Sequence, residues 1–401
     1  LGQLRLIVDA LGQNPALLDP LTPPPVVHFL GHIVAPPGAP GRFPADQEPD
    51  VRAGVEAALR RRPVSRAIGS LAAGADVVIA EAALAAGAEV DVVLPFRLDE
   101  FVEISVRPAG EAWVARMQAC LARARQVHYV TEDAYLGDDA LFAYATEFAL
   151  GLAALRARWL NTEVYQLAVW DGTPPDPGVV GGTANDLALG RRLGLAQEIV
   201  PVRSTRQAGG AMAASSPPAA AARIGRTPRS LLFGDFKGFS RLDDAQLPVY
   251  VAEVLGRCAD VLKRHEAHLV FRNTWGDGLF LVLDDVAAAA DCAFDLQAAI
   301  EAIDRAALGL PETLALRLGF HYGPVYETVD PVLGRPNCFG YHVSRAARVE
   351  PITPEGAVYV TEQTAAAMAL ACPDRYRCEY VGRAPLAKGY GSFPMYHVRP
   401  A

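Results

Sequence analysis

The segment GDFKGFSRL, residues 234–242, follows the apolar run Leu231-Leu232-Phe233 and decides how the second half of the chain is interpreted. The apolar run predicts a buried strand with Asp235 at its end. The turn after it offers successive backbone N–H groups, an arrangement that binds phosphate. The segment therefore places a carboxylate, which suits a metal ion, beside a turn that suits a polyphosphate, although an Asp at a strand end most often only makes a turn.

A second carboxylate follows in the hairpin turn NTWGDG, where Asp277 lies between the strand-like runs 268–273 and 278–283. If this hairpin pairs with the first strand, Asp235 and Asp277 meet at one edge of the sheet. Two carboxylates without neighbouring Cys or His suit hard cations such as Mg²⁺ or Mn²⁺. Two such ions can stabilise both the attacking and the leaving oxygen of a displacement at phosphorus.

The order of elements after residue 228 predicts an α+β sandwich of ferredoxin-like type. Strands are expected at 229–235, 268–273, 278–283, 313–323, 357–362, 376–382 and 395–400, and helices at 246–266, 285–306 and 340–350.

Five motifs occur in this region in the order FGDFKGFSRL, WGDG, LRLGFHYGPV, FGYHVSRAARVE and LAKGYGSFPMYHV. Together they resemble the class III nucleotidyl cyclase catalytic domain, the adenylate and guanylate cyclase family, over about residues 229–398. The resemblance implies a reaction in which the 3′-hydroxyl of a nucleoside triphosphate attacks its own α-phosphorus and pyrophosphate leaves. It also implies two Mg²⁺ or Mn²⁺ ions per active site.

The resemblance assigns a role to each matching position. Metal ligands are implied at Asp235, Asp277 and the carbonyl of Phe236, and phosphate contacts at Phe239, Ser240, Arg317 and Lys388. Arg348 matches the arginine that stabilises charge on the reacting phosphoryl group. Because the aspartates and this arginine come from two catalytic domains in the family, and this chain has one, the resemblance predicts a head-to-tail homodimer with shared sites.

Three positions depart from the family pattern. Asn273 and Asn337 stand where base-reading residues are usually Lys and Asp, or Glu and Cys, and Ser344 stands where an Asn usually orients the ribose. An Asn amide can match adenine, cytosine or uracil edges. Three interpretations stay open: an adenylate cyclase with an unusual base pocket, a pyrimidine cyclase of an antiphage signalling system, and a catalytically inactive nucleotide-binding regulatory module.

The first half of the chain, residues 1–203, predicts a doubly wound, Rossmann-like domain with a mostly parallel sheet. Strand-like runs at 26–34, 64–70, 90–96, 126–131, 164–172 and 198–202 alternate with helical patterns at 48–61, 74–87, 111–125, 139–159 and 183–193. Residues 204–228 are small, Gly-rich and Pro-rich, and predict a flexible linker to a catalytic domain at 229–401.

The stretch GSLAAGADVVIAEAALAAGAEVDVVLPF, residues 69–96, resembles SLOG-type Rossmann-like domains, which bind nucleotides or nucleotide-derived ligands. A ligand would then lie near Gly69, Ser70, Gly74 and Asp76, and a second anion cradle is expected at Gly181, Gly182 and Thr183. The alternative is that these glycines only allow tight turns. The sequence shows no nucleophile–base constellation here, which favours a sensor over a second enzyme.

Composition limits the partners. The net charge is -8 without a basic stripe, so nucleic-acid binding is not expected. The six cysteines are scattered as in reduced, cytoplasmic proteins. We expect no signal peptide, and no membrane segment, because no uninterrupted apolar run reaches the length of a membrane helix.

Overall fold

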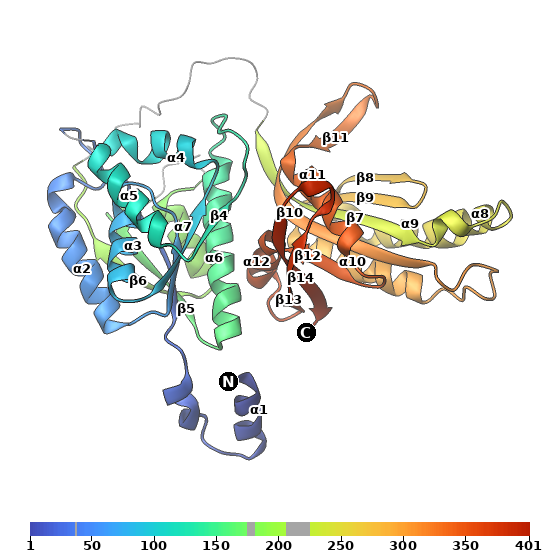
Figure 1. The fold of residues 1–401 in the computed structure, drawn as a ribbon, viewed down its shortest axis with the longest axis horizontal. Coiled ribbons are helices and arrows are strands. Elements are labelled where there is room, and N and C mark those ends of the chain that lie inside the picture. Colours follow the sequence, from blue (N-terminus) through green and yellow to red (C-terminus); the bar gives the residue numbers. More distant parts are fainter. Residues whose placement is uncertain (37, 175–180, 206–224) are drawn as a thin grey trace. The chain divides into compact units, whose positions relative to one another are not determined.

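The computed structural model describes residues 1–36, 38–174, 181–205 and 225–401, and the chain folds into two compact units, Leu1–Ala222 and Arg223–Ala401 (Figure 1). Most of the predicted linker therefore lies outside the described residues. Its last residues do not, because strand β7 begins at Arg226 rather than at 229. The predicted linker is too long at this end, since Arg226 is buried and pairs with Tyr326 in the sheet.

The N-terminal unit is built on one sheet of six parallel strands in the order β4-β3-β2-β1-β5-β6. The strands are β1 (Val26–Gly31), β2 (Arg66–Gly69), β3 (Glu89–Leu94), β4 (Gln126–Tyr129), β5 (Val164–Trp170) and β6 (Ala196–Pro201). The strand order reverses between β1 and β5, and open α/β sheets bind ligands beyond the carboxyl ends of strands at such a point.

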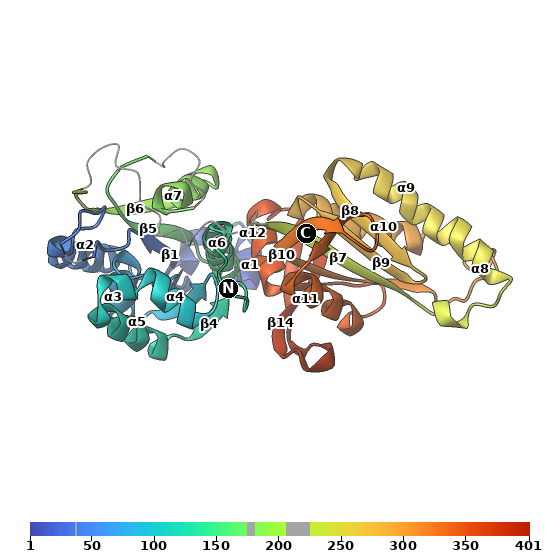
Figure 2. The same ribbon diagram turned by 90° about the horizontal axis from the view of Figure 1, so that it is seen from above.

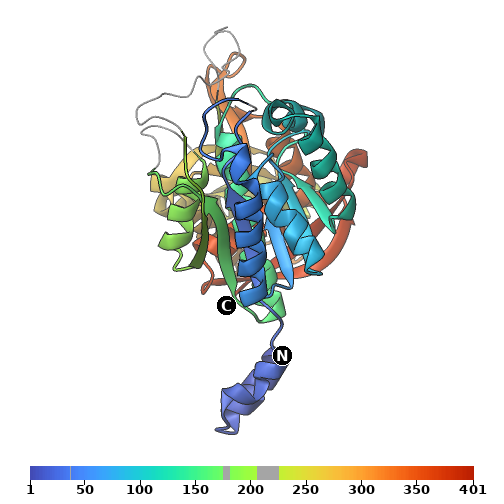
Figure 3. The ribbon, with the colours of Figure 1, turned by 90° about the vertical axis from the view of Figure 1, so that its left-hand side faces the viewer.

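Helices cover both faces of this sheet, as the predicted Rossmann-like fold requires. These helices are α2 (Glu48–Arg61), α3 (Ala75–Ala85), α4 (Leu98–Ser105), α5 (Glu111–Arg123), α6 (Ala140–Leu160) and α7 (Thr183–Arg192), while α1 (Gly2–Ala10) has no buried residue and packs beside the turn Pro15–Leu21. Helix α3 contacts both α2 and α5, and α6 contacts α7. In Figure 2, α3 and α5 lie on the opposite side of the strands from α7, and in Figure 3, α2 (blue) lies in front of the sheet.

Helix α6 packs on β1, β2 and β3. Among the described residues it alone has the length and composition of a candidate membrane span, and most of that stretch is buried within the unit.

The C-terminal unit contains a mixed sheet in the order β13-β14-β12-β10-β7-β9-β8, and β11 extends it by pairing with β10. The strands are β7 (Arg226–Lys237), β8 (Leu269–Trp275), β9 (Gly278–Leu283), β10 (Ala315–Asp330), β11 (Arg335–Phe339), β12 (Val358–Thr361), β13 (Tyr376–Pro385) and β14 (Ser392–Pro400). The sequence did not predict β11, because its exposed, Pro-containing run carries no apolar alternation.

The helices of this unit are α8 (Gln246–Val249), a π-helical segment η5 (Tyr250–Leu255), α9 (Gly256–Arg264), α10 (Val286–Glu301), α11 (Tyr341–Val349) and α12 (Glu362–Ala371). Helix α10 contacts α9, α12 and the sheet, while α11 contacts β7, β10, β11 and β12. Leu231 of β7 packs in one core cluster with Ala346 of α11, and Phe233 packs against that cluster. Because side chains alternate along a strand, Asp235 projects on the same face of β7 as these two residues.

Candidate functional site

Asp235 pairs across the sheet with Arg317, one of the predicted phosphate ligands. The two residues lie directly opposite each other on β7 and β10. Nη2 and Nε of Arg317 donate to Oδ2 of Asp235 at 2.7 and 3.0 Å. Asp235 lies inside β7, which continues to Lys237, and not at the strand end that the sequence suggested.

Asp277 lies in the turn between β8 and β9, as predicted, and is brought beside Asp235 by the register of the hairpin. Asp235 pairs with Gly278, and the backbone N–H of Phe236 donates to the carbonyl of Asp277 at 3.2 Å. Asp235 on β7 and Asp277, directly before β9, therefore lie at the turn end of the hairpin. This is the convergence that the spacing of the two motifs predicts.

Tyr250, which the sequence analysis missed, supports this corner from the π-helical segment. It is buried, its ring packs against Phe236 and Phe239, and its hydroxyl donates to the carbonyl of Gly276 at 3.4 Å. Burial, with smaller contributions from Asp277 and Asp235, raises the pKa of its hydroxyl. Tyr250 thus links the hairpin turn to the turn that contains Phe239 and the exposed Ser240. A π-helical segment within α-helix is a feature often found at functional sites.

Glu350, directly after α11, adds a third carboxyl group to this corner. Its Oε1 lies 2.6 Å from Nε of Arg317. Burial raises the pKa of Glu350 to about 7, Arg317 lowers it, and both Asp235 and Asp277 raise it further. Glu350 therefore belongs to the same corner as Asp235 through their shared contact with Arg317.

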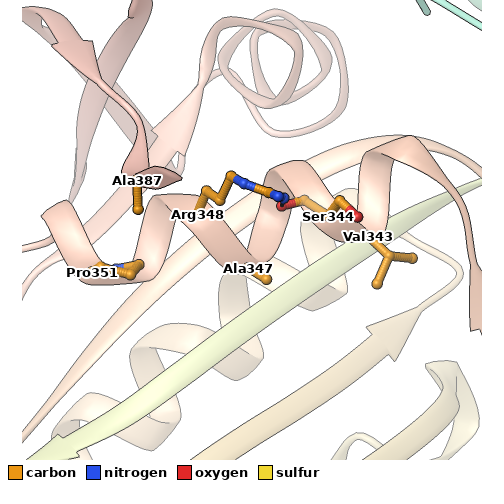
Figure 4. Close-up of a pocket in the computed structure, with 6 residues that line it drawn as sticks. All are labelled: Val343, Ser344, Ala347, Arg348, Pro351 and Ala387. Carbon is orange, nitrogen blue, oxygen red and sulfur yellow. Dashed lines mark hydrogen bonds between the residues drawn. The ribbon is translucent and has the colours of Figure 1, made fainter. Parts of the chain in front are cut away.

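A second group of predicted residues gathers on α11. Ser344 and Arg348 are one helical turn apart, and Nη1 of Arg348 donates to the carbonyl of Ser344 at 2.5 Å. Figure 4 shows both beside an open hollow of about 410 Å³, lined by Val343, Ser344, Ala347, Arg348, Pro351 and Ala387. Nε of Arg348 is buried and makes no hydrogen bond within the described residues.

Lys388 belongs to the turn Ala387–Gly389, next to this hollow, but its side chain lies outside the described part of the structure. The neighbouring Tyr390 holds the turn against α11, since its ring lies 4.2 Å from the guanidinium carbon of Arg348. The fold therefore brings the backbone of Lys388 close to Ser344 and Arg348.

The two asparagines at the predicted base-reading positions lie on two strands, Asn273 on β8 and Asn337 on β11. Nη2 of Arg335 donates to Oδ1 of Asn273 at 2.9 Å. Asn337 uses both ends of its amide within the chain, donating to Asp330 at 3.0 Å and accepting from the N–H of Cys338 at 2.8 Å. Arg335 is thus an additional polar group at this position that the sequence analysis did not consider.

The chain holds these residues as two half-sites that adjoin at the end of α11, where Arg317 donates to the carbonyl of Pro351, a residue that also lines the hollow beside Arg348. Within the described part of the chain, no hydrogen bond or ion pair joins Arg348 to Asp235, Asp277 or Arg317. One half carries carboxylates and the other carries an arginine with an unused donor.

Residues 226–399 match the sequence model of the adenylate and guanylate cyclase catalytic domain. They form a cyclase catalytic domain. The resemblance drawn from the five motifs is confirmed for this part of the chain, and it identifies the enzyme class as a lyase that forms cyclic nucleotides.

Several solved structures are similar to the cyclase domain. The adenylyl cyclase CyaB from P. aeruginosa is 16% identical, with a TM-score of 0.39, over 44% of this chain and 95% of that chain. The guanylate cyclase domain of RhGC from Catenaria anguillulae, in complex with GTP, is 20% identical, with a TM-score of 0.37, over 43% and 96%. An adenylate cyclase from Trypanosoma brucei in its monomeric state is 21% identical, with a TM-score of 0.37, over 43% and 87%. A search of curated proteins found no match.

The donor set of the cyclase domain fits divalent cations in part. Asp235 and Asp277 supply hard oxygen ligands, and the guanidinium of Arg317 on Oδ2 of Asp235 shows that a positive charge is accommodated there. No three His, Cys, Asp or Glu side chains are grouped to hold a metal among the described residues. Further ligands would have to come from the Phe236 carbonyl and from substrate oxygens.

In the N-terminal unit, close packing of the backbone explains why glycine stands at two positions of the SLOG-like stretch. A Cβ on Gly69 would lie 2.5 Å from the carbonyl oxygen of Phe29, and one on Gly74, which has φ 112°, would lie 2.4 Å from the N of Val34. Ser70 follows β2 directly. These observations favour a tight turn at Gly74 and a close approach to Phe29 at Gly69 as the reasons for these glycines.

A hydrogen-bonded group that the sequence analysis missed lies at the point where the strand order reverses. His32 follows β1, Asp171 follows β5, and Thr183 begins α7. Nε2 of His32 lies 3.0 Å from Oδ1 of Asp171, and Nδ1 lies 3.2 Å from the Thr183 hydroxyl. Oδ2 of Asp171 is buried and has no hydrogen-bond partner within the described residues. Three elements therefore converge here through polar side chains, as nucleophile–base–carboxylate groups do.

Two buried acids near this point make the stability of the N-terminal unit depend on pH. Burial raises the pKa of Asp76 and of Asp186 to about 7, and Asp76 raises that of Asp186 further. The folded state then binds more protons than the unfolded state, so stability falls as pH rises from about 4 to about 7, by a few kcal/mol per group. Asp186→Asn should flatten this slope in thermal unfolding of the full chain. An unchanged slope in both Asp186→Asn and Asp76→Asn would contradict the assignment.

Proposed function

We propose that this chain converts a nucleoside triphosphate, ATP being the expected substrate, to a 3′,5′-cyclic mononucleotide and pyrophosphate at the interface of a homodimer. The single observation that carries the proposal is the pairing of Asp235, Asp277 and Arg317 at one corner of a cyclase catalytic domain.

The proposed roles follow from charge and position. Bound Mg²⁺ or Mn²⁺ ions, expected as a pair, would neutralise the triphosphate and acidify the 3′-hydroxyl. Asp235, Asp277 and the Phe236 carbonyl would hold these ions, and Phe239, Ser240, Arg317 and Lys388 would hold the phosphates. Arg348, with its unpaired Nε, would donate to the α-phosphoryl oxygens as negative charge develops. The bond from the α-phosphorus to O3′ forms, the bond to the pyrophosphate oxygen breaks, and the hydroxyl proton passes to solvent.

A dimer is proposed because, among the described residues, no hydrogen bond or ion pair joins Arg348 to the carboxylates of its own chain. In a head-to-tail pair, the carboxylates of one subunit would face Ser344, Arg348 and Lys388 of the other, giving two equivalent sites.

Recognition of the base is assigned to Asn273 and Asn337. Asn337 uses its oxygen and one N–H within the chain, whereas no hydrogen bond within the described residues uses the N–H donors of Asn273, which suit a base edge. A pyrimidine cyclase of an antiphage signalling system, and an inactive nucleotide-binding module, stay as alternatives. Incubation of the protein with Mn²⁺ and each of the four ribonucleoside triphosphates separates them. Cyclic AMP supports the proposal, cyclic CMP or UMP supports the pyrimidine alternative, and nucleotide binding without any cyclic product supports the inactive module.

The N-terminal unit is proposed to regulate the cyclase by binding a nucleotide-like ligand at the carboxyl ends of β1 and β5. The N-terminus of α7 after Gly181 and Gly182 suits a phosphate, and the His32–Asp171 pair fixes the Thr183 hydroxyl at this helix start. A panel of nucleoside mono-, di- and triphosphates is first screened for the compound that most raises the temperature at which the N-terminal unit unfolds. Asp171→Asn should remove the stabilisation that this compound gives. Equal stabilisation of both proteins would contradict this site.

A further inference from the structure

Arg317 is shared between two carboxylates that come from different elements. Its Nη2 and Nε lie 2.7 and 3.0 Å from Oδ2 of Asp235, and its Nε lies 2.6 Å from Oε1 of Glu350. The side chains of Asp235, Arg317 and Glu350 are 22%, 26% and 16% exposed, so the group is largely shielded from water. In such surroundings a charge that loses its partner is costly, and each of the three depends on the others.

The position of Glu350 is built into the fold. A Cβ on Gly319 would lie 2.5 Å from the backbone N of Glu350, so only glycine lets this backbone approach β10 so closely. Gly319 is two residues after Arg317 and therefore on the same face of the strand. Glu350 is thus held beside Arg317 by the backbone and does not depend on a mobile loop.

A cation at Asp235 would compete with the guanidinium for the same oxygen. Both groups are positive, and Oδ2 is the Asp235 atom that both nitrogens of Arg317 contact. When a divalent ion takes this oxygen, Arg317 needs another anionic partner that keeps it beside the triphosphate. Glu350 is the carboxylate already within reach.

We infer that Glu350 is a positioning residue that retains Arg317 when a metal ion binds Asp235. The inference rests on the proposed function, because it concerns the metal site of that function. Without the Glu350 charge, Arg317 has Asp235 as its remaining carboxylate partner and competes more strongly with the ion. Glu350 therefore favours metal binding through Arg317, without contacting the metal.

Binding of Mn²⁺ alone to the full chain tests this in a double-mutant cycle at pH 8, where Glu350 carries its charge. The EPR signal of the free ion measures the binding. Glu350→Gln should weaken Mn²⁺ binding about ten-fold, the size typical of coupled charges in contact. Arg317→Gln should bind Mn²⁺ at least as tightly as the unmodified protein. Adding Glu350→Gln to Arg317→Gln should then change the affinity by less than about two-fold, because the competitor is gone.

Two results would overturn the inference: equal affinities of Glu350→Gln and the unmodified protein, or the same loss in both backgrounds, which would make Glu350 a metal ligand itself. Glu350→Asp keeps the charge on a shorter side chain and should bind with intermediate affinity, and it serves if the Gln variant does not fold. If the unmodified protein forms cyclic nucleotide but the double-mutant cycle shows no coupling between Glu350 and Arg317 in Mn²⁺ binding, only the inference fails. If the coupling appears but no triphosphate is cyclised, the proposed function fails and the inference stands.

Discussion

Asp277→Ala is expected to reduce cyclic nucleotide formation about 1,000-fold or more, because divalent cations contribute several kcal/mol of charge stabilisation in such reactions. Asp277 is half-exposed in the β8–β9 turn. Its backbone carbonyl, which accepts from Phe236, is unaffected by the substitution. The loss should therefore appear in the rate at saturating triphosphate and not in stability.

Asp284→Ala is the matched control, because Asp284 follows the same strand β9 at its other end and contacts the exposed His268. Its activity should stay within about two-fold of the unmodified protein, as for most surface changes. Thermal unfolding of both variants checks the fold. Retention of more than a tenth of the activity by Asp277→Ala would contradict a metal role for this residue.

Arg348→Ala is expected to lose activity by about 1,000-fold, in the range found for arginines that stabilise phosphoryl transfer. Its guanidinium stacks on Tyr390 and donates to the Ser344 carbonyl, while its buried Nε has no acceptor among the residues that the structure describes. Because the guanidinium fork holds two donors in one plane, Arg348→Lys should recover only a small part of the activity. A full rescue by Lys would show that charge alone is required. Metal binding without nucleotide should be unchanged in both variants.

The sequence predicted that Asp235 and Asp277 lie together in the cyclase domain because the strands that carry or adjoin them are neighbours in the sheet. A short hairpin that pairs with the strand of Asp235 brings its turn, and therefore Asp277, close to that aspartate. The parallel sheet of the N-terminal unit was predicted because a chain in which apolar strands alternate with helices usually folds into a parallel sheet covered by helices.

Tyr250, Glu350 and the His32–Asp171 pair were missed because their partners depend on tertiary packing. Tyr250 reaches the hairpin turn from a π-helical segment, and the spacing of apolar residues in the sequence does not predict such a segment. His32 and Asp171 both lie at ends of predicted strands, but their contact requires β1 and β5 to be neighbours. Strand order cannot be read from alternation alone. A signal for Glu350 was present in ARVE, two residues after Arg348, where an acid follows the helix that carries the predicted catalytic arginine.

Mixing Asp277→Ala with Arg348→Ala tests most directly whether each active site is assembled from two chains. Each variant alone should be inactive, while a mixed dimer keeps one site that contains both residues. After random exchange of subunits, about a quarter of the activity of the unmodified protein should return, because half of the dimers are mixed and each has one intact site. No recovery, with mixed dimers demonstrated by mass spectrometry, would contradict the shared site.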